Sequence, residues 1–277
     1  MSIFAYDPFI MFITVITDCR DANAQSRQET RYAELFPGTH VSFVGVSSDI
    51  EAAGNLIDVL DGAGEAEGVI AVNVAPRHGR AKEKWPNGTP FGYFWFKKIL
   101  VVCTIDGETL SLVKKFGLAD RVNVTDIREV MLFGGYDESV IEHAATSQFR
   151  SFDYLPRLAR IVWDKKDAPC DVLPFSDIPD AGPGVWWIDS FGNCKTTLLP
   201  NDIQFEEGAK REFVLNGLAI VATCYKQLRS VPDYQTGLIV GSSGYGDKRF
   251  VELVVQGTSA AKHYQISQKD TFEITRG

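Results

Sequence analysis

The sequence predicts two folded parts: an α/β N-terminal domain with a mostly parallel central sheet, and then a small all-β barrel. Three observations support this prediction. Apolar runs alternate with helix-like stretches over the first half of the chain, as they do in βαβ units. After residue 184, short β-rich runs separated by turn residues replace them, which is typical of a barrel. A stretch with four prolines, residues 164–184, separates the two patterns.

The N-terminal pattern begins with the apolar run MFITVI at residues 11–16, which predicts a strand buried on both faces. A helix-permissive stretch follows at 21–35, and Ser47-Ser48-Asp49 provides an N-cap for a later amphipathic helix. Further strands are expected at 40–46, 69–74 and 99–105, and a helix at 108–117 that Gly117 would end.

The C-terminal pattern consists of short β-rich runs at 184–189, 211–223, 236–242, 248–256 and 270–276. The spacing of the intervening Gly, Asn, Asp and Ser turns favours a barrel. We therefore expect an α/β domain at 1–165, a linker at 166–183 and a β-barrel domain at 184–277.

Composition excludes several functional classes. The net charge of −8 argues against nucleic acid as a partner, because phosphate binding needs a dense basic surface. The five cysteines are scattered without a C-x-x-C pair, and the four histidines have no zinc-binding spacing. The sequence thus predicts neither a disulfide framework nor a metal site, and a reducing compartment is expected.

The N-terminal segment is apolar but does not have the pattern of a signal peptide. It lacks a basic region and a small-residue cleavage site, and Asp7 interrupts it. No run reaches the roughly 18 to 20 apolar residues of a membrane span. We expect a cytoplasmic protein that does not enter membranes.

Two aspartates follow predicted strands of the α/β domain. Asp18 comes directly after the first strand and Asp106 after the strand at 99–105. In an open α/β sheet, ligands bind at the carboxyl ends of the strands, where these carboxylates could accept from ribose hydroxyls. The alternative is local: Asp18 or Asp21 would cap the next helix, and Asp106 would form a turn with Gly107.

The loop at 75–88 gathers cations around glycines, namely Arg77, His78, Arg80, Lys82 and Lys84. Such a cluster could bind an anion, and the alternative is a solvated surface loop. It has neither of the glycine patterns that cradle phosphates.

The segment Asp189-Ser190-Phe191-Gly192-Asn193 combines an anion, an aromatic ring, a glycine and an amide at a predicted strand end. Asp can hold an ammonium group, Asn matches an adenine edge, and Phe offers a stacking face. The alternative is a hairpin turn with a core Phe. A second stretch, 241–261, is rich in Gly and Ser and could bind a carboxylate.

Together, these features resemble the S-adenosyl-L-methionine hydroxide adenosyltransferase family, whose relatives are the fluorinase and the chlorinase. The matching motifs are Thr17-Asp18, the D-x-F-G-N segment at 189–193 and the small-residue run that ends at 261. The resemblance covers nearly the whole chain. It implies a homotrimer with active sites between neighbouring subunits, and an SN2 displacement at the ribose C5′ of S-adenosyl-L-methionine, which is a substrate. No other cofactor is implied.

The resemblance also implies roles for individual residues. Asp18 would hold the ribose hydroxyls, and Asp189 with Ser242 or Ser243 would hold the methionyl amine and carboxylate. The adenine would be held by the positions Asn193, Phe191, Val255 and Gly257.

The residues that activate the nucleophile depart from the family pattern. Hydroxide-using members hold water with an Asp-Arg-His set. The matching positions here carry Ala75, Lys82 and Arg150. Ser151 falls on a serine of the halogenases, whose basic loop the segment 79–85 also resembles. Arg150, Ser151 and Lys82 are therefore the candidate catalytic residues.

Three functions follow as hypotheses. The first is an enzyme that uses water to give adenosine and L-methionine. The second is a halogenase that uses chloride or fluoride. The third is a catalytically inactive protein that binds S-adenosyl-L-methionine or adenosine, since ligand-holding positions are kept and activating ones are not.

Overall fold

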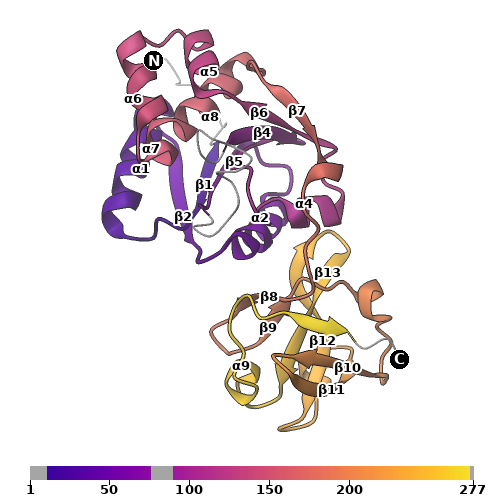
Figure 1. Ribbon diagram of the computed structural model, residues 1–277. Coiled ribbons are helices and arrows are strands. Elements are labelled where there is room, and N and C mark those ends of the chain that lie inside the picture. The colour runs from indigo at the N-terminus through magenta and orange to yellow at the C-terminus, as the bar shows by residue number, and fades with distance from the viewer. Residues whose placement is uncertain (1–10, 76–89, 275–277) are drawn as a thin grey trace, which may run out of the picture. The chain divides into compact units, whose positions relative to one another are not determined.

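The computed structural model describes residues 11–75 and 90–274, which belong to two compact units. Unit 1 comprises Met1–Ser47, Ala63–Gly107 and Leu118–Asp177, and unit 2 comprises Ser48–Gly62, Glu108–Gly117 and Ile178–Gly277. Each unit has its own seven-stranded sheet (Figure 1). The division does not follow the chain in one cut, because two segments from the first half belong to unit 2.

The sheet of unit 1 has the strand order β2-β1-β3-β5-β4-β6-β7. Its strands are β1 (Phe12–Thr17), β2 (His40–Gly45), β3 (Gly68–Asn73), β4 (Phe91–Phe96), β5 (Ile99–Thr104), β6 (Arg121–Thr125) and β7 (Asp171–Pro174). The pairings among β2, β1, β3 and β5 are parallel, and the other three are antiparallel. The carboxyl ends of β1, β3 and β5 therefore lie at one edge of the sheet.

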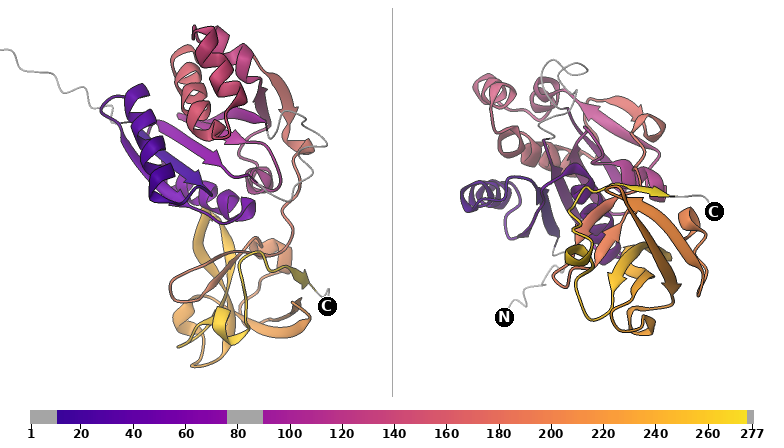
Figure 2. Two further views of the ribbon diagram at one scale, coloured as in Figure 1. Left: turned by 60° about the vertical axis from the view of Figure 1, so that its left-hand side comes forward. Right: turned by 60° about the horizontal axis from the view of Figure 1, so that its bottom comes forward.

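Helices cover one face of this sheet (Figure 2). The helices among the described residues of unit 1 are α1 (Ala22–Leu35), α5 (Ile127–Phe133), α6 (Glu138–Thr146), α7 (Arg150–Asp153), α8 (Leu155–Lys165) and the 3-10 turn η1 (Phe175–Asp177). Helix α8 places Leu155, Leu158 and Val162 on one side at helical spacing, and all three are buried. That side packs on β3 and β5, with α1 and α7 beside it.

The sheet of unit 2 has the order β14-β10-β11-β12-β13-β9-β8. Its strands are β8 (Val185–Ile188), β9 (Cys194–Thr196), β10 (Lys210–Leu215), β11 (Leu218–Tyr225), β12 (Thr236–Tyr245), β13 (Lys248–Val255) and β14 (Phe272–Ile274), with short helices η2 (Pro200–Ile203), η3 (Leu228–Ser230) and α9 (Ala260–His263). A bridge between Gly184 and Thr271 joins the edges at β8 and β14. The sheet is thus nearly closed into a barrel.

Two helices from the first half of the chain belong to unit 2: α2 (Asp49–Ala63) and α4 (Ser111–Phe116). Gly54 of α2 lies directly against the Trp186 ring, with no room for a Cβ atom. The ring of Phe250 lies 5.7 Å from that of Trp186 and 5.0 Å from that of Phe116, measured between centroids. These aromatic contacts pack both helices onto the barrel.

The structure contains the mixed α/β and barrel-like parts that the sequence predicts, with two differences. Only half of the strand pairings in unit 1 are parallel. Strand β4 forms a hairpin with β5 through a two-residue turn at Lys97-Lys98, and β6 and β7 continue the sheet with antiparallel pairings. Residues 166–183, expected to be a linker, include β7, which pairs with β6. This strand is only four residues long and ends in Pro174, so in the sequence it resembles the rest of the proline-rich stretch.

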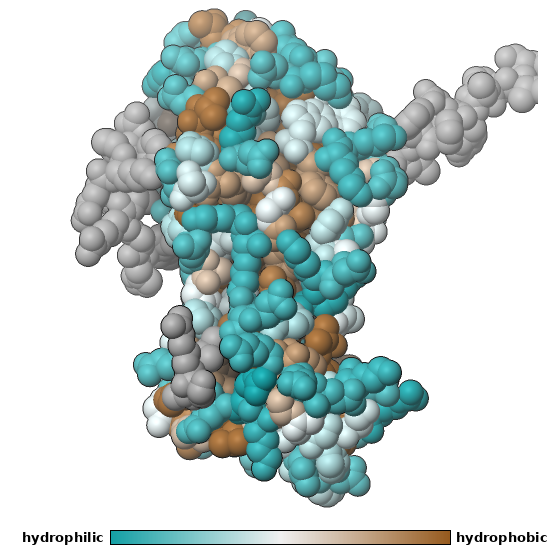
Figure 3. All heavy atoms as spheres, turned by 90° about the vertical axis from the view of Figure 1, so that its right-hand side faces the viewer, coloured by the Kyte–Doolittle hydropathy of each residue, from teal (hydrophilic) through white to brown (hydrophobic). Residues whose placement is uncertain are grey.

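Apolar side chains on the face shown in Figure 3 occur in separate patches between hydrophilic ones. Exposed large apolar side chains of the two units include Leu132, Val172, Phe191 and Tyr234. Among the residues that the structure describes, no helix has the length and apolar character that crossing a membrane requires.

Candidate ligand-binding site

Asp18 lies at the carboxyl end of β1, as the sequence predicts. Its Oδ2 accepts a hydrogen bond from the backbone N–H of Ala75, at 3.1 Å, and its own N–H donates to the Asn73 carbonyl, at 3.2 Å. The carboxylate therefore joins the ends of β1 and β3. Since a carboxylate has about four lone-pair positions, Asp18 can accept further hydrogen bonds from a ligand.

Cys19, next to Asp18, is a nucleophilic residue type at the same strand end. Its thiol donates to Asp18 Oδ1, with sulfur and oxygen 3.7 Å apart. Burial, and then the charge of Asp18, raise the pKa of this thiol. The thiol is therefore protonated at neutral pH, and a thiolate mechanism is not favoured here.

The local alternatives for the neighbouring aspartates are correct. Asp21 caps α1 by accepting from Ala24 N–H at 2.9 Å. Asp106 accepts from the adjacent Gly107 N–H, also at 2.9 Å, and thus forms a turn.

The three candidate catalytic residues are in different situations. Lys82, with the rest of the basic loop from residue 76 onward, lies outside the described residues. Arg150 begins α7, and its guanidinium carbon lies 5.4 Å from the centre of the Phe91 ring. Burial lowers the pKa of Arg150. Ser151, the next residue, is buried at 5% exposure, which limits the access of a ligand to its hydroxyl.

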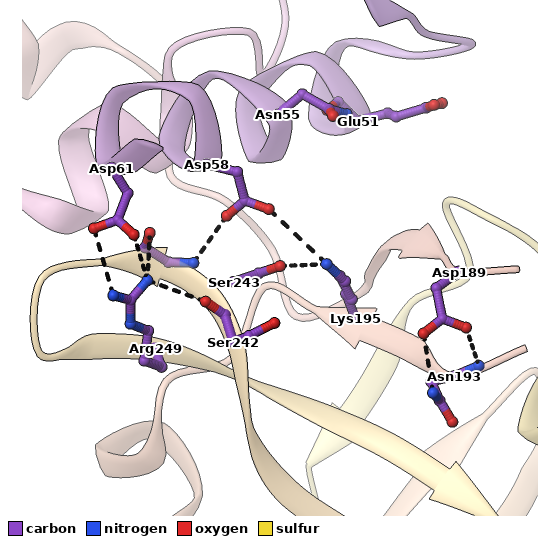
Figure 4. A network of polar contacts seen from close by, with 11 residues as sticks. Glu51, Asn55, Asp58, Asp61, Asp189, Asn193, Lys195, Ser242, Ser243 and Arg249 are labelled. Atoms are coloured by element: carbon purple, nitrogen blue, oxygen red, sulfur yellow. Dashed lines mark hydrogen bonds and ion pairs between the residues drawn. The ribbon is translucent and has the colours of Figure 1, made fainter. Parts of the chain in front are cut away.

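The segment 189–193 forms the turn between β8 and β9, and Asp189 organises it. Asp189 Oδ1 accepts from the backbone N–H of Phe191 at 2.9 Å. Its Oδ1 also accepts from the backbone N–H of Asn193, and its Oδ2 from the Asn193 side-chain amide, both at 2.9 Å (Figure 4). Gly192 has a φ of +86°, and a Cβ there would lie 1.9 Å from Ser259 Oγ. The turn is therefore rigid and requires glycine.

Phe191 is not a core residue, contrary to the alternative considered for this segment. It is 79% exposed on the rigid turn. The turn contacts the segment after β13, since Ala261 N–H donates to the Gly192 carbonyl at 3.0 Å. Tyr234, 78% exposed, lies beside Gly257 of the same segment. Two aromatic rings are thus presented to solvent around one pair of loops.

Val255 and Gly257, the expected backbone contacts for adenine, lie in this segment. Gly257 has a φ of +79°, and the Val255 carbonyl accepts from Thr258 N–H at 3.3 Å. The turn they form leaves Val255 buried.

Ser242 and Ser243 lie on β12 but differ in surroundings. Ser242 is exposed, and its carbonyl accepts from Arg249 Nη1 at 3.0 Å. Ser243 is buried, and its hydroxyl accepts from Lys195 Nζ. The hydrogen bonds of Asp189 stay within its own turn (Figure 4), and the expected joining of Asp189 and Ser243 is not among the contacts of the described residues.

Lys195 is the centre of a polar network that the sequence does not indicate. Its ammonium lies 3.9 Å from Asp58 Oδ2 of α2 and 5.6 Å from the centre of the Trp186 ring. Asp58 also accepts from Gly244 N–H at 2.9 Å. A neighbouring pair joins Asp61 to Arg249 at 2.7 Å (Figure 4).

Glu252 adds a third carboxyl to the surroundings of Lys195. It is 7% exposed on β13. Burial raises its pKa, Lys195 opposes this rise, and the charges of Asp189 and Asp58 add to it. Burial likewise raises the pKa of Asp58. The carboxyls of Asp58, Asp189 and Glu252 outnumber the single ammonium group of Lys195. This part of unit 2 therefore favours an added positive charge.

The comparisons with known proteins give a fold and no family. No protein-family model and no curated protein matches the chain. Among solved structures, an uncharacterized conserved protein from Thermotoga maritima is similar, with a TM-score of 0.68 and 16% identity, over 95% of this chain and all of that one.

A conserved hypothetical protein from Thermus thermophilus is similar as well. It has a TM-score of 0.58 and 14% identity, over 96% of this chain and all of its own. At such identities, the two likenesses show a shared fold and no activity.

Proposed function

We propose that this protein binds S-adenosyl-L-methionine and promotes the attack of water at ribose C5′, which releases adenosine and L-methionine. The observation that carries the proposal is the exposed Phe191 ring on a turn that Asp189 fixes with three hydrogen bonds. A ring that is both rigid and exposed can stack on a planar base at little entropic cost. Its neighbours provide polar groups for the rest of the ligand.

The charge distribution of unit 2 supports a cationic ligand. S-adenosyl-L-methionine carries a sulfonium and an ammonium against one carboxylate. Asp58, Asp189 and Glu252 act electrostatically on the same region and exceed the charge of Lys195. Carboxylates that are destabilised by burial and by each other's charge are stabilised by a nearby cation. Lys195 and Ser243 would meet the carboxylate of the ligand.

In the proposed reaction, the water oxygen forms a bond to C5′ as the C5′–sulfur bond breaks. The sulfur keeps the electron pair and becomes the thioether of methionine, and the water loses a proton to solvent. The sulfonium is a good leaving group, so alignment and partial desolvation provide most of the rate increase. In the homotrimer that the family resemblance implies, Asp18 of a neighbouring subunit would fix the ribose through lone pairs that Ala75 and Cys19 do not use.

Chromatography after incubation with S-adenosyl-L-methionine tests the reaction. We expect equimolar adenosine and methionine, and a reduced yield from Asp18→Asn. The variant Asp106→Asn serves as the control, because Asp106 occupies the equivalent place after β5 but bonds to its own turn. If a 5′-halo-adenosine forms when chloride or fluoride is supplied, the nucleophile is halide and not water. If no product forms above the blank, turnover is refuted.

Ligand binding without turnover is a second candidate function. It is favoured by the burial of Ser151 and by the presence of Ala75, which has no acid or base group, beside Asp18. Calorimetry with S-adenosyl-L-methionine and with adenosine separates this case, because heat of binding without product would support it. If neither heat of binding nor product is observed, both candidate functions are refuted.

Truncation of the Phe191 ring should weaken binding and leave folding intact. Stacking of a base on an aromatic ring is worth about 1 to 3 kcal/mol, so Phe191→Ala should raise the dissociation constant roughly 5- to 150-fold. The ring is 79% exposed, and thermal stability should therefore stay close to that of the wild type. Leu218→Ala, another exposed apolar truncation in unit 2, is the control. Equal affinities of wild type and Phe191→Ala would contradict the assignment.

The family resemblance also leads us to propose a homotrimer. An exposed rigid aromatic ring such as Phe191 is typical of contact surfaces as well as of ligand sites. Light scattering after size-exclusion chromatography measures the mass directly, and a monomer at micromolar concentration would exclude this assembly.

A further inference from the structure

Arg157 of α8 is a buried cation that forms no ion pair with the carboxylates of the described residues. Its side chain belongs to a residue that is 9% exposed. One guanidinium nitrogen, Nη1, donates to the Asp153 carbonyl. The Nε–H is buried with no acceptor, and no carboxylate of the described part of the chain forms an ion pair with this guanidinium. Burial of an unpaired charge is strongly unfavourable unless another group compensates it.

Charged groups of both signs lie near Arg157. Burial lowers the pKa of Arg157 and the nearby Arg31 of α1 lowers it further, whereas Tyr136, Asp153 and Glu34 raise it. The ring centre of Tyr136 lies 5.6 Å from the guanidinium carbon. Arg157, Arg31 and Arg160 all lower the pKa of the Tyr136 hydroxyl, against the effects of burial and Glu34. Arg31 of α1 and Arg157 of α8 therefore both lie near Tyr136, and the two helices contact each other.

Two acidic residues lie near this region, and each has a partner other than Arg157. Asp153 accepts from the Ser147 hydroxyl, and one of its oxygens lies 3.6 Å from His143 Nε2. Glu34 pairs with Arg31 through Nε at 3.3 Å, and its side chain is 65% exposed. An exposed pair of this kind contributes little energy and is screened by salt. Both carboxylates attract Arg157 electrostatically, but neither forms an ion pair with its guanidinium.

The orientation of Arg31 is fixed by stacking. Its guanidinium carbon lies 4.7 Å from the centre of the Phe152 ring, which Arg27 also approaches at 4.5 Å. Stacking on a ring holds a guanidinium plane while leaving its N–H edge able to donate. Arg160, one turn along α8, is different, because it pairs with Asp164 at 2.8 Å and donates to the Leu35 carbonyl.

We propose that Arg31 and Arg157 form a binding site for a small oxyanion of the phosphate class, beside Tyr136 between α1 and α8. Planar guanidinium groups match the oxygens of such an anion in pairs. The anion would satisfy the Nε–H of Arg157 and neutralise the two like charges. This site belongs to unit 1, and it does not depend on the function proposed above.

The test measures the melting temperature of the full chain against inorganic phosphate, with sodium chloride used to hold the ionic strength constant. Because a ligand that binds the folded state stabilises it, we expect the wild type to melt several degrees higher at saturating phosphate. Arg157→Met should abolish this rise, and should melt at or above the wild-type temperature without phosphate, since it removes an unpaired buried charge.

Two further variants make the result specific. Arg31→Met, on the outer side of the site, should also reduce the phosphate response. This variant should fold normally, so it tests the site even if Arg157→Met does not fold. Arg160→Met changes a paired arginine of the same helix and should keep the full response. A wild type that is insensitive to phosphate, or an Arg157→Met variant that retains the response, would overturn the proposal.

Discussion

Gly54→Ala should lower the free energy of unfolding by about 3 kcal/mol or more, which is the upper part of the range for overpacked cores. A Cβ atom at Gly54 would lie 2.2 Å from a ring carbon of Trp186, which is 1% exposed and also packs on Phe250. The ring cannot move aside without displacing its other neighbours. Chemical denaturation followed by circular dichroism measures the loss.

Gly62 of the same helix provides the matched control. A Cβ atom there meets nothing within 4 Å, so Gly62→Ala should stabilise the protein by up to about 1 kcal/mol through helix propensity. The two substitutions therefore have opposite signs. Equal effects at both positions would show that the contact between α2 and Trp186 is absent in solution.

Lys195→Met should destabilise the protein by about 2 to 4 kcal/mol at pH 7. This range is lower than the roughly 3 to 5 kcal/mol for breaking a fully buried ion pair, because Asp58 is partly exposed. The substitution leaves the carboxyls of Asp58 and Glu252 without their cation. Burial already raises both pKa values, and loss of Lys195 raises them further. A carboxyl with a raised pKa binds its proton more tightly in the folded state, so stability falls as pH rises from the ordinary carboxyl range to the raised pKa.

The deficit of Lys195→Met should consequently shrink on acidification from pH 7 towards about pH 4, the ordinary carboxyl range. Addition of Glu252→Gln should restore much of the loss at pH 7. The ion pair of Asp61 and Arg249 serves as an internal control with the opposite pH dependence, because the pKa of Asp61 is lowered. Its stabilisation is present above the ordinary carboxyl range and is lost as the pH falls through the lowered pKa, so the deficit of Arg249→Met should persist until strong acid. A Lys195→Met deficit independent of pH would contradict the account.

The sequence predicts β1, β3 and β5 well because each is a mainly apolar run, and nearly all of their residues are buried in the structure. It does not predict β4 or β6. The hairpin before β5 turns at Lys97 with a φ of 51°, whereas the usual signal for such a turn is Asn or Gly. Strand β6 has the mixed sequence RVNVT, whose polar residues resemble a loop.

The candidate site is predictable only where its chemistry is local. Asp18 and Asp189 can be found because a carboxylate directly after a strand is visible in sequence. Their partners are not: Lys195 meets Asp58 from a distant segment, and Asp58 with Asp61 resembles the solvated side of a helix. The exposure of Phe191 also depends on how the turn packs against Ser259, which no local pattern encodes.

The membership of α2 in unit 2 affects how the protein can fold and be dissected. The bond between Gly244 and Asp58 spans 186 residues of chain, so this unit has a high contact order and should complete late, after synthesis of the barrel strands. A fragment starting at residue 178 would expose Trp186 and leave Arg249 without Asp61. A cut at the apparent boundary would therefore remove an essential part of the C-terminal folding unit, even though every barrel strand would be present.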